Sequence, residues 1–247
     1  MPYIIDDSQD IFGWSYSLMP RLRGEYLYSK HQKATLSVNE KLKISELISK
    51  TLAEFHTWTV NECGELNTEN FNINRFKEPY VQWLYKRIIF WLEDARKYSI
   101  ITSNDFQWVE NLLEDSKEAF NHFTAPTFVM GDFKPGNFLL HLGDRGWEIS
   151  GVFDFTNSYF ADPISDLIKM IIFYLDNNEY EMAKHLVRLY CSEFEEKEYL
   201  IKRINVHMLH QRILDWGCAK ATNMVTWDRE LSFSHWIEAY TDSVANF

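Results

Sequence analysis

The sequence predicts an α+β protein that is mainly helical, with a small β-hairpin in the middle of the chain and another near its start. Three observations predict this class. Helical periodicity dominates from Ser37 onward, short apolar runs bounded by turn residues occupy 126–153, and partly alternating apolar residues occupy 1–30. The 247 residues, 46% of them apolar and 16% aromatic, are enough for a sizeable core in one domain or in two unequal lobes.

The first thirty residues are expected to be extended. The runs YII and FGWSYSLM flank the polar stretch DDSQD, which is the pattern of a hairpin. Pro20 and Gly24 then interrupt the chain before the helical pattern begins. We therefore expect two short strands and a connecting segment at this end of the chain.

From Ser37 the apolar residues recur with the period of a helix. The apolar stripe contains Leu42, Leu47, Ile48, Leu52 and Phe55. Ser37 or Asn39 would cap the start of this helix. Further helices are expected at 78–98, about 104–122, 163–175, 179–194, 197–222 and 229–244. Strand-like stretches are expected at 126–130, 138–142 and 147–153, and GDRG separates the last two as a hairpin turn.

Composition excludes several classes of function. A formal net charge of −11 makes nucleic acid an unsuitable partner, and an acidic surface would attract a cationic small molecule, although many acidic proteins are simply soluble. The start MPYIIDDSQD does not resemble a signal peptide, and the apolar run MIIFYL is too short to span a membrane. Cys63, Cys191 and Cys218 are scattered, so we predict no disulfide and no zinc site, and we expect a cytoplasmic protein.

The stretch VMGDFKPGNFLL (129–140) contains the residues that could carry chemistry. Asp132 and Asn137 flank a tight Lys-Pro-Gly turn, and Asp154 follows the next predicted strand. If the two strands pair, their ends lie side by side and Asn137 meets Asp154, which gives two of the oxygen ligands that Mg²⁺ prefers. Asp132 would then lie beside the metal, where it could accept a proton from a hydroxyl group.

Each of these residues also has an ordinary structural explanation. Taken singly, Asp132 and Asn137 are typical turn residues, Asp154 could cap a helix, and Lys134 would be solvated. Their combination around a hairpin of suitable length favours a phosphoryl-transfer site instead.

VMGDFKPGNFLL followed by GVFDFTNSYFADPISDL (151–167) resembles the aminoglycoside phosphotransferase and choline kinase-like family, whose core is shared with protein kinases. The earlier SYSLMPRLRGEYL resembles the family's hinge, and LAEFHTW resembles a helix of the family that ends in a Phe-His pair. The resemblance implies a protein-kinase-like C-terminal lobe with a small catalytic hairpin. It divides the chain into 1–30, which holds remnant N-lobe strands and the hinge, and 31–247, a mainly helical catalytic lobe.

The resemblance also assigns roles to single residues. Asp132 would be the catalytic base, Asn137 and Asp154 the Mg²⁺ ligands, and Lys134 a contact to a phosphate of ATP. Backbone groups near Leu18 and Met19 would meet the adenine of ATP. Two further residues, Asp162 and Asp166, would brace the loop by hydrogen bonds.

The chain departs from the family pattern in two ways. Met130 occupies the position of the usual histidine before Gly-Asp. The Gly-rich strand pair and the ATP-binding lysine of the family would lie before Met1, so a missing segment or a partner chain could complete the N-lobe.

We therefore expect an ATP- and Mg²⁺-dependent phosphotransferase that transfers the γ-phosphate to a hydroxyl of a small, amine-bearing molecule. The alternative is a truncated, non-catalytic pseudo-enzyme or binding module of the same fold. A purely structural helical protein is a third, less favoured hypothesis.

Overall fold

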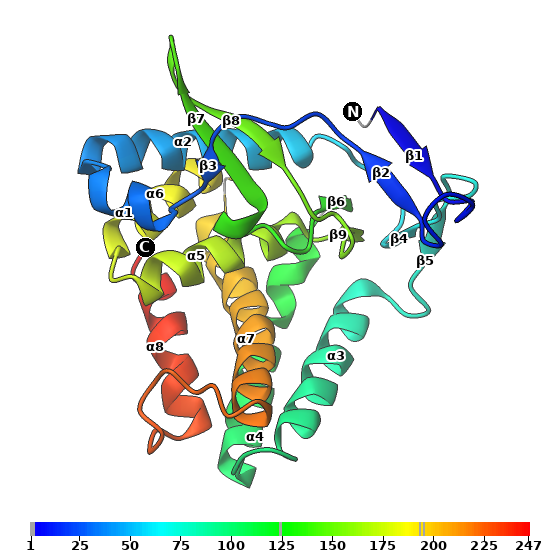
Figure 1. The fold of residues 1–247 in the computed structure, drawn as a ribbon. Helices are drawn as coiled ribbons and strands as arrows, with labels where there is room; N and C mark the ends of the chain where they lie inside the picture. Colours follow the sequence, from blue (N-terminus) through cyan, green and yellow to red (C-terminus); the bar gives the residue numbers. More distant parts are fainter. Residues whose placement is uncertain (1–2, 124, 193, 195) are drawn as a thin grey trace.

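The computed structural model describes residues 3–123, 125–192, 194 and 196–247, and Figure 1 shows their fold. A mainly helical body carries three small antiparallel sheets. The helices are α1 (Lys30–Thr35), α2 (Val38–Phe55), α3 (Tyr80–Ala95), α4 (Ser103–Ser116), α5 (Leu167–Asp176), α6 (Tyr180–Cys191), α7 (Lys197–Ala221) and α8 (Phe233–Ala245). None of the helices in these ranges combines the length and the apolar composition of a membrane span.

The sheets are built from short strands. The first sheet pairs β1 (Ile4–Asp6) with β2 (Tyr16–Leu18), and the second has the order β3 (Glu25–Tyr26), β7 (Phe138–Gly143) and β8 (Gly146–Val152). The third has the order β5 (Ile73–Arg75), β4 (Gly64–Leu66), β9 (Tyr159–Ala161) and β6 (Thr127–Val129). Both predicted hairpins, β1–β2 and β7–β8, are therefore present.

The start of α2 shows why the helix begins where the sequence predicts. The Ser37 hydroxyl accepts a hydrogen bond from the Glu40 backbone N–H at 3.3 Å, and the Glu40 carboxylate accepts one from the Ser37 N–H at 2.9 Å. This capping box satisfies two backbone donors at the helix start and is worth about 1 kcal/mol. Of the two predicted caps, the structure uses Ser37 and not Asn39.

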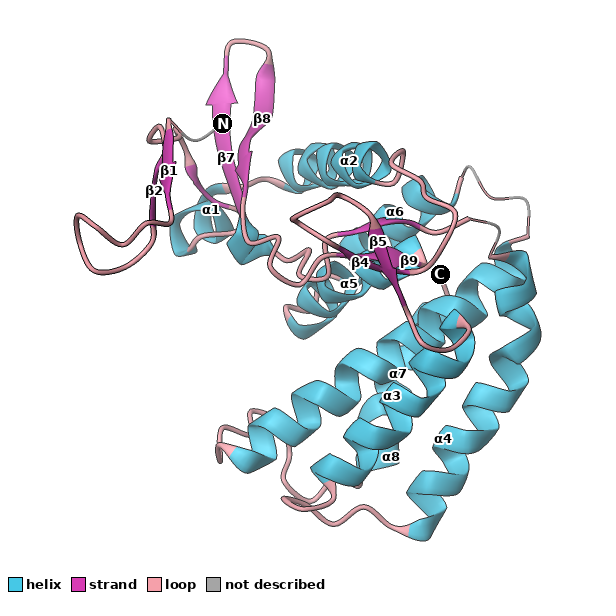
Figure 2. Cartoon of the chain, turned by 90° about the vertical axis from the view of Figure 1, so that its right-hand side faces the viewer, coloured by secondary structure: helices cyan, strands magenta, loops and turns pink. Residues whose placement is uncertain are grey.

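Two apolar clusters form the core. The first packs the β7–β8 hairpin against α2, α5 and α6, and the second fills the space between α3, α4, α7 and α8. Helix α7 contributes to both clusters, with Ile204 and Met208 in the first and Ile213 and Trp216 in the second. Figure 2 shows α3, α4, α7 and α8 as a bundle beside the sheets. The central position of α7 places its residues next to the site described below.

Several predicted boundaries were wrong, and the reasons are local. The helix expected at 104–122 ends at Ser116 and continues as a 3₁₀ turn, Lys117–His122. The helix expected at 229–244 starts only at Phe233, because the Ser232 hydroxyl caps it. The helix expected at 163–175 begins as a 3₁₀ turn, because Asp162 caps the backbone N–H of Ile164.

The short elements β3, β4, β5, β9 and α1 were not predicted. Each of these strands has two or three residues, which is too short for a visible alternation, and they form because a distant strand offers backbone partners.

Candidate active site

The loop after β6 holds Asp132 in a defined place. Gly131 has φ +76°, and a Cβ there would lie 2.3 Å from the carbonyl oxygen of Asn157, so only glycine fits. The Asp166 carboxylate accepts hydrogen bonds from the backbone N–H groups of Met130 at 2.7 Å and Gly131 at 2.8 Å. The loop backbone is thus fixed by a buried carboxylate immediately before Asp132.

Asp132 is buried and contacted on both carboxylate oxygens. Lys169 donates to Oδ1 at 2.6 Å, and the Lys134 ammonium lies 2.6 Å from Oδ2. The side-chain amide of Asn137 donates to Oδ2 at 2.9 Å and to the Asp132 carbonyl oxygen at 2.8 Å. Burial raises the pKa of the Asp132 carboxyl, but the bonds from Lys134, Lys169 and Asn137 outweigh burial and hold this pKa below its ordinary value. Asp132 is therefore ionised at neutral pH.

The two ends of the β7–β8 hairpin lie side by side. Phe138 is paired with Val152, and the backbone N–H of Phe153 donates to the Asn137 carbonyl oxygen at 2.9 Å. The next residue, Asp154, is exposed and has φ +64°, a left-handed conformation that is uncommon for a residue with a side chain. Thr156 donates its hydroxyl to Asp154 Oδ1 at 2.5 Å. Asn137 and Asp154 are thus presented at the same end of the hairpin.

These two residues fit a magnesium ion. Because Nδ2 of Asn137 points at Asp132, its Oδ1 is turned away, and no donor among the described residues bonds to it or to Asp154 Oδ2. The described residues also contain no group of three or more His, Cys, Asp or Glu side chains that could hold a metal by themselves. One amide oxygen and one carboxylate, with water and phosphate oxygens completing the shell, is a donor set that suits Mg²⁺.

Asp162 has a different role from Asp166. Its buried carboxylate accepts a hydrogen bond from Arg203 Nε at 2.9 Å and lies 3.1 Å from His207 Nε2. Burial alone would raise the pKa of the Asp162 carboxyl. Arg203 and His207 lower this pKa by more than burial raises it, so the carboxyl stays ionised. The resemblance led us to expect both acids to brace the loop. Asp166 contacts the loop directly, whereas Asp162 ties the chain after β9 to α7.

The residue at the usual histidine position, Met130, is fully buried in the first core cluster. Support for the loop comes instead from Asp166, whose Oδ2 lies 3.5 Å from His56 Nε2. His56 Nδ1 in turn lies 2.6 Å from the Tyr190 hydroxyl. His56, at the end of α2, therefore lies next to the Asp166 carboxylate that holds the loop.

Some of the predicted site residues lie together in the structure and others lie apart. It joins Asp132, Lys134 and Asn137 directly and places Asp154 next to them along the hairpin. The predicted adenine contacts, Leu18 and Met19, lie exposed at the end of β2, and no hydrogen bond among the described residues joins them to Asp132. The Leu18 carbonyl oxygen accepts a bond from the N–H of Tyr3 at 2.7 Å.

Sequence analysis missed Lys169. This lysine stands three residues after Asp166, so both lie on one face of the first turns leading into α5. It is the single charged residue between Leu167 and Leu175 in an otherwise apolar helix, a signal that could have indicated a role.

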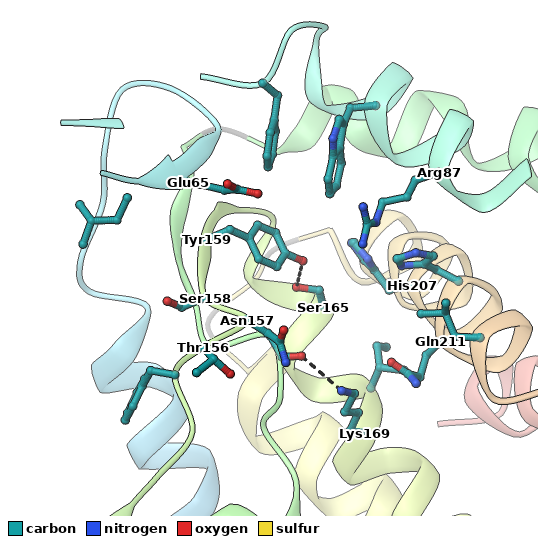
Figure 3. Close-up of a pocket in the computed structure, with 18 of the residues that line it drawn as sticks. Glu65, Arg87, Thr156, Asn157, Ser158, Tyr159, Ser165, Lys169, His207 and Gln211 are labelled. Atoms are coloured by element: carbon teal, nitrogen blue, oxygen red, sulfur yellow. Dashed lines mark hydrogen bonds between the residues drawn. The ribbon is translucent and has the colours of Figure 1, made fainter. Parts of the chain in front are cut away.

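A cavity of about 750 Å³ opens beside the Asp132 loop. Gly131 and Lys169 line it on the loop side, and Figure 3 shows Lys169 pointing into it from α5. An aromatic wall lies opposite, where Phe76 and Trp83 stack with ring centroids 4.2 Å apart. The cavity has the size of a site for a small molecule.

A helical lobe with a buried, lysine-contacted aspartate and a hairpin that presents Asn and Asp at one end is the arrangement expected of a kinase-like phosphotransferase. Sequence comparison agrees with this. A family model described as the phosphotransferase enzyme family (APH) matches residues 1–199. The chain belongs to this family. Among curated proteins no match was found.

Solved structures with the same fold include phosphotransferases for different acceptors. The GDP complex of a mutant aminoglycoside 2'-phosphotransferase-IIIa is 14% identical, with a TM-score of 0.62 over 100% of this chain and 74% of that chain. A ternary complex of a thermostable mutant of aminoglycoside phosphotransferase APH(4)-Ia with AMP-PNP and hygromycin B is 14% identical, with a TM-score of 0.59 over 99% and 75% of the two chains. Plasmodium vivax ethanolamine kinase is 14% identical, with a TM-score of 0.57 over 99% and 66%. At 14% identity, these similarities show the fold alone.

Proposed function

We propose that this chain transfers the γ-phosphate of ATP to a hydroxyl group of a small molecule. The observation that carries the proposal is the placement of Asp132, ionised and bonded to Asn137, next to Gly131 and Lys169, which line a cavity of about 750 Å³. Family membership and nucleotide complexes among proteins of the same fold support it.

Asp132 would orient the acceptor hydroxyl and accept its proton. Its lowered pKa makes it a weak base, so proton transfer would come late, after the phosphoryl group has begun to move. A loose phosphoryl-transfer transition state needs little base strength and depends mainly on positioning. The hydrogen bonds that the Met130 and Gly131 N–H groups donate to Asp166 would supply this positioning.

The two lysines would serve the phosphate. The Lys134 side chain is 45% exposed and can turn from Asp132 towards a phosphate oxygen, whereas Lys169 is more enclosed and would stay with the carboxylate. Asn137 Oδ1 and the Asp154 carboxylate would hold Mg²⁺, which when bound would neutralise charge on the phosphate oxygens. Backbone groups near Leu18 and Met19 would contact adenine, as the resemblance implies.

The identity of the acceptor is a separate matter. The net charge of −11 would favour an amine-bearing acceptor. The acceptor would bind in the cavity, however, so the charges that line the cavity decide its class.

The test is transfer of labelled γ-phosphate from ATP to a panel of hydroxylated small molecules in the presence of Mg²⁺. Asp132→Asn is expected to lower the transfer rate by about 10²- to 10⁴-fold, because the positioned carboxylate is lost. Asp144→Asn, which removes an exposed acid from the β7–β8 turn, is the matched control, and its transfer rate is expected to equal that of the wild type. Equal rates for wild type and Asp132→Asn contradict the proposal.

A second candidate is a nucleotide-binding module without turnover. It is favoured by the contacts of Lys134 and Lys169, which occupy both carboxylate oxygens of Asp132. Calorimetric binding of ATP and Mg²⁺ without any transfer to the panel would support this candidate, and transfer that depends on Asp132 would exclude it.

A further inference from the structure

The cavity beside Asp132 has a second end, formed where α3 faces α7. Trp83, Arg87 and Trp91 are spaced four residues apart, so they lie on one face of α3, and all three line the cavity. His210 and Gln211 line it from α7. In Figure 3 Arg87 reaches into the space between the two helices.

This end of the cavity offers hydrogen-bond donors that the protein does not use. The Arg87 guanidinium lies over the Trp83 ring at 5.2 Å and forms no ion pair with any described residue. The Trp91 Nε1 atom is buried and has no hydrogen-bond partner in the described part of the chain. An indole N–H can only donate, so it needs an acceptor, and a buried donor without one costs about 1–3 kcal/mol.

His210 supplies a second unsatisfied group. Its Nε2 is buried and has no partner among the described residues. Burial lowers the pKa of His210 to about 3, and His207, Arg87 and Lys169 lower it as well, so the ring is neutral. His210 thus lines the cavity together with Arg87 and with Lys169, whose ammonium group is paired with Asp132.

Acidic groups are scarce in the same cavity. Among its lining residues the only carboxylate is that of Glu65, which is exposed on β4. A polyamine would need several carboxylates to replace the water around its ammonium groups. The lining instead presents the Arg87 guanidinium and the unpartnered Trp91 N–H, while Lys169 is paired with Asp132, so the surface charge of the whole chain does not describe this cavity.

We propose that the α3–α7 end of the cavity binds an anionic oxygen group, carboxylate or phosphate, of the acceptor, which is therefore a small hydroxylated acid. The placement of its hydroxyl at Asp132 rests on the proposed function. Arg87 contacts the anionic group through its planar fork of donors, and the Trp91 N–H adds a further bond. The apolar part of the molecule packs against the stacked rings of Phe76 and Trp83.

The test measures calorimetric binding of four probes that share one skeleton, a benzyl group on a carbon that bears the hydroxyl. They are 3-phenyllactate, 2-hydroxy-3-phenylpropyl phosphate, 3-phenyllactamide and 1-amino-3-phenylpropan-2-ol. Wild type is expected to bind one or both acids at least about 10-fold more tightly than the amide and to bind the amine least. The tighter of the two acids identifies the source of the anionic group.

Three variants sharpen the result. Arg87→Gln is expected to weaken binding of the acid by about 10- to 100-fold and to leave the amide unchanged, because only the charge-assisted bonds are lost. Arg87→Glu is expected to reverse the preference in favour of the amine. Lys86→Gln is the matched control, since this neighbouring lysine on α3 pairs with Glu78 at the surface.

Tighter binding of the amine by wild type, no binding of either acid, or an equal loss in the Arg87 and Lys86 variants overturns the assignment. Binding is measured without turnover, so the two proposals fail separately. An enzyme that phosphorylates hydroxyls but prefers the amine overturns the acceptor class alone. A chain that binds the acid through Arg87 but transfers no phosphate overturns the proposed function alone.

Discussion

The two hairpins of this protein have similar local signals and very different surroundings. Both β1–β2 and β7–β8 are short antiparallel pairs, joined by residues 7–15 in the first and by the two polar residues 144–145 in the second. In Figure 1 the β7–β8 hairpin rises from the helical body, with its lower end held against it, whereas β1–β2 lies to one side. Phe138 of β7 is 0% exposed, and Phe12 in the β1–β2 connection is 53% exposed. The proposed site residues Asn137 and Asp154 therefore lie at the ends of the hairpin that is anchored in the core.

The largest expected effect tests the difference in anchoring between the two hairpins. Phe138→Ala should lower the free energy of unfolding by about 3–5 kcal/mol, because it opens a cavity next to Phe133 inside the first core cluster. Phe12→Ala, the same substitution in the other hairpin, should cost less than about 1 kcal/mol. Urea denaturation of both variants measures the difference. Equal losses would show that β1–β2 is as firmly anchored as β7–β8.

A second pair compares two carboxylates that each accept two hydrogen bonds. Asp166→Asn should cost about 1.5–3 kcal/mol, because the buried amides of Met130 and Gly131 lose a charged acceptor. Asp6→Asn removes the acceptor of two bonds from Ser8 at the surface and should cost less than about 0.5 kcal/mol. The measurement is again urea denaturation. A small effect at Asp166 would mean that the Asp132 loop is held by other contacts.

The smallest effect concerns pH and the cavity. The pKa of His210 is about 3 in the folded protein and about 6.5 in an unfolded chain, so below pH 6.5 the unfolded state binds the proton first. Stability should therefore fall as the pH is lowered from 6.5 towards 3, by on the order of 1 kcal/mol between pH 7.5 and 5.5. His210→Gln should remove this part of the pH dependence, and His31→Gln, which changes an exposed histidine, should not. An unchanged pH profile in His210→Gln would argue that the pKa of His210 is the same in the folded and unfolded chain.

The local parts of the structure could be predicted from the sequence. Asp132, Lys134 and Asn137 stand close together along the chain, and a single hairpin brings Asp154 to them, so motif and turn chemistry were sufficient. The helix from Ser37 was predicted because its cap and its apolar stripe are both visible. The same holds for the hydrogen bonds of Asp166 to the loop, which the family resemblance implied.

The other half of the cavity could not be predicted in this way. Arg87, Lys169 and His210 come from α3, α5 and α7, and each taken alone is an ordinary polar residue of a helix. Their meeting depends on how three helices pack, which depends on many side chains far apart in the sequence. The four-stranded sheet escaped prediction for the same reason, since β4, β5 and β9 are held by partners and not by their own three-residue patterns.

The left-handed backbone at Asp154 has a consequence for the composition of this turn. Glycine would adopt φ +64° without the steric cost of about 1 kcal/mol that a side chain brings. For the fold alone, glycine would therefore be more favourable than aspartate at this position. The chain nevertheless keeps an exposed acid here, next to Phe153, whose N–H is bonded to the Asn137 carbonyl oxygen, as the proposed Mg²⁺ site would require.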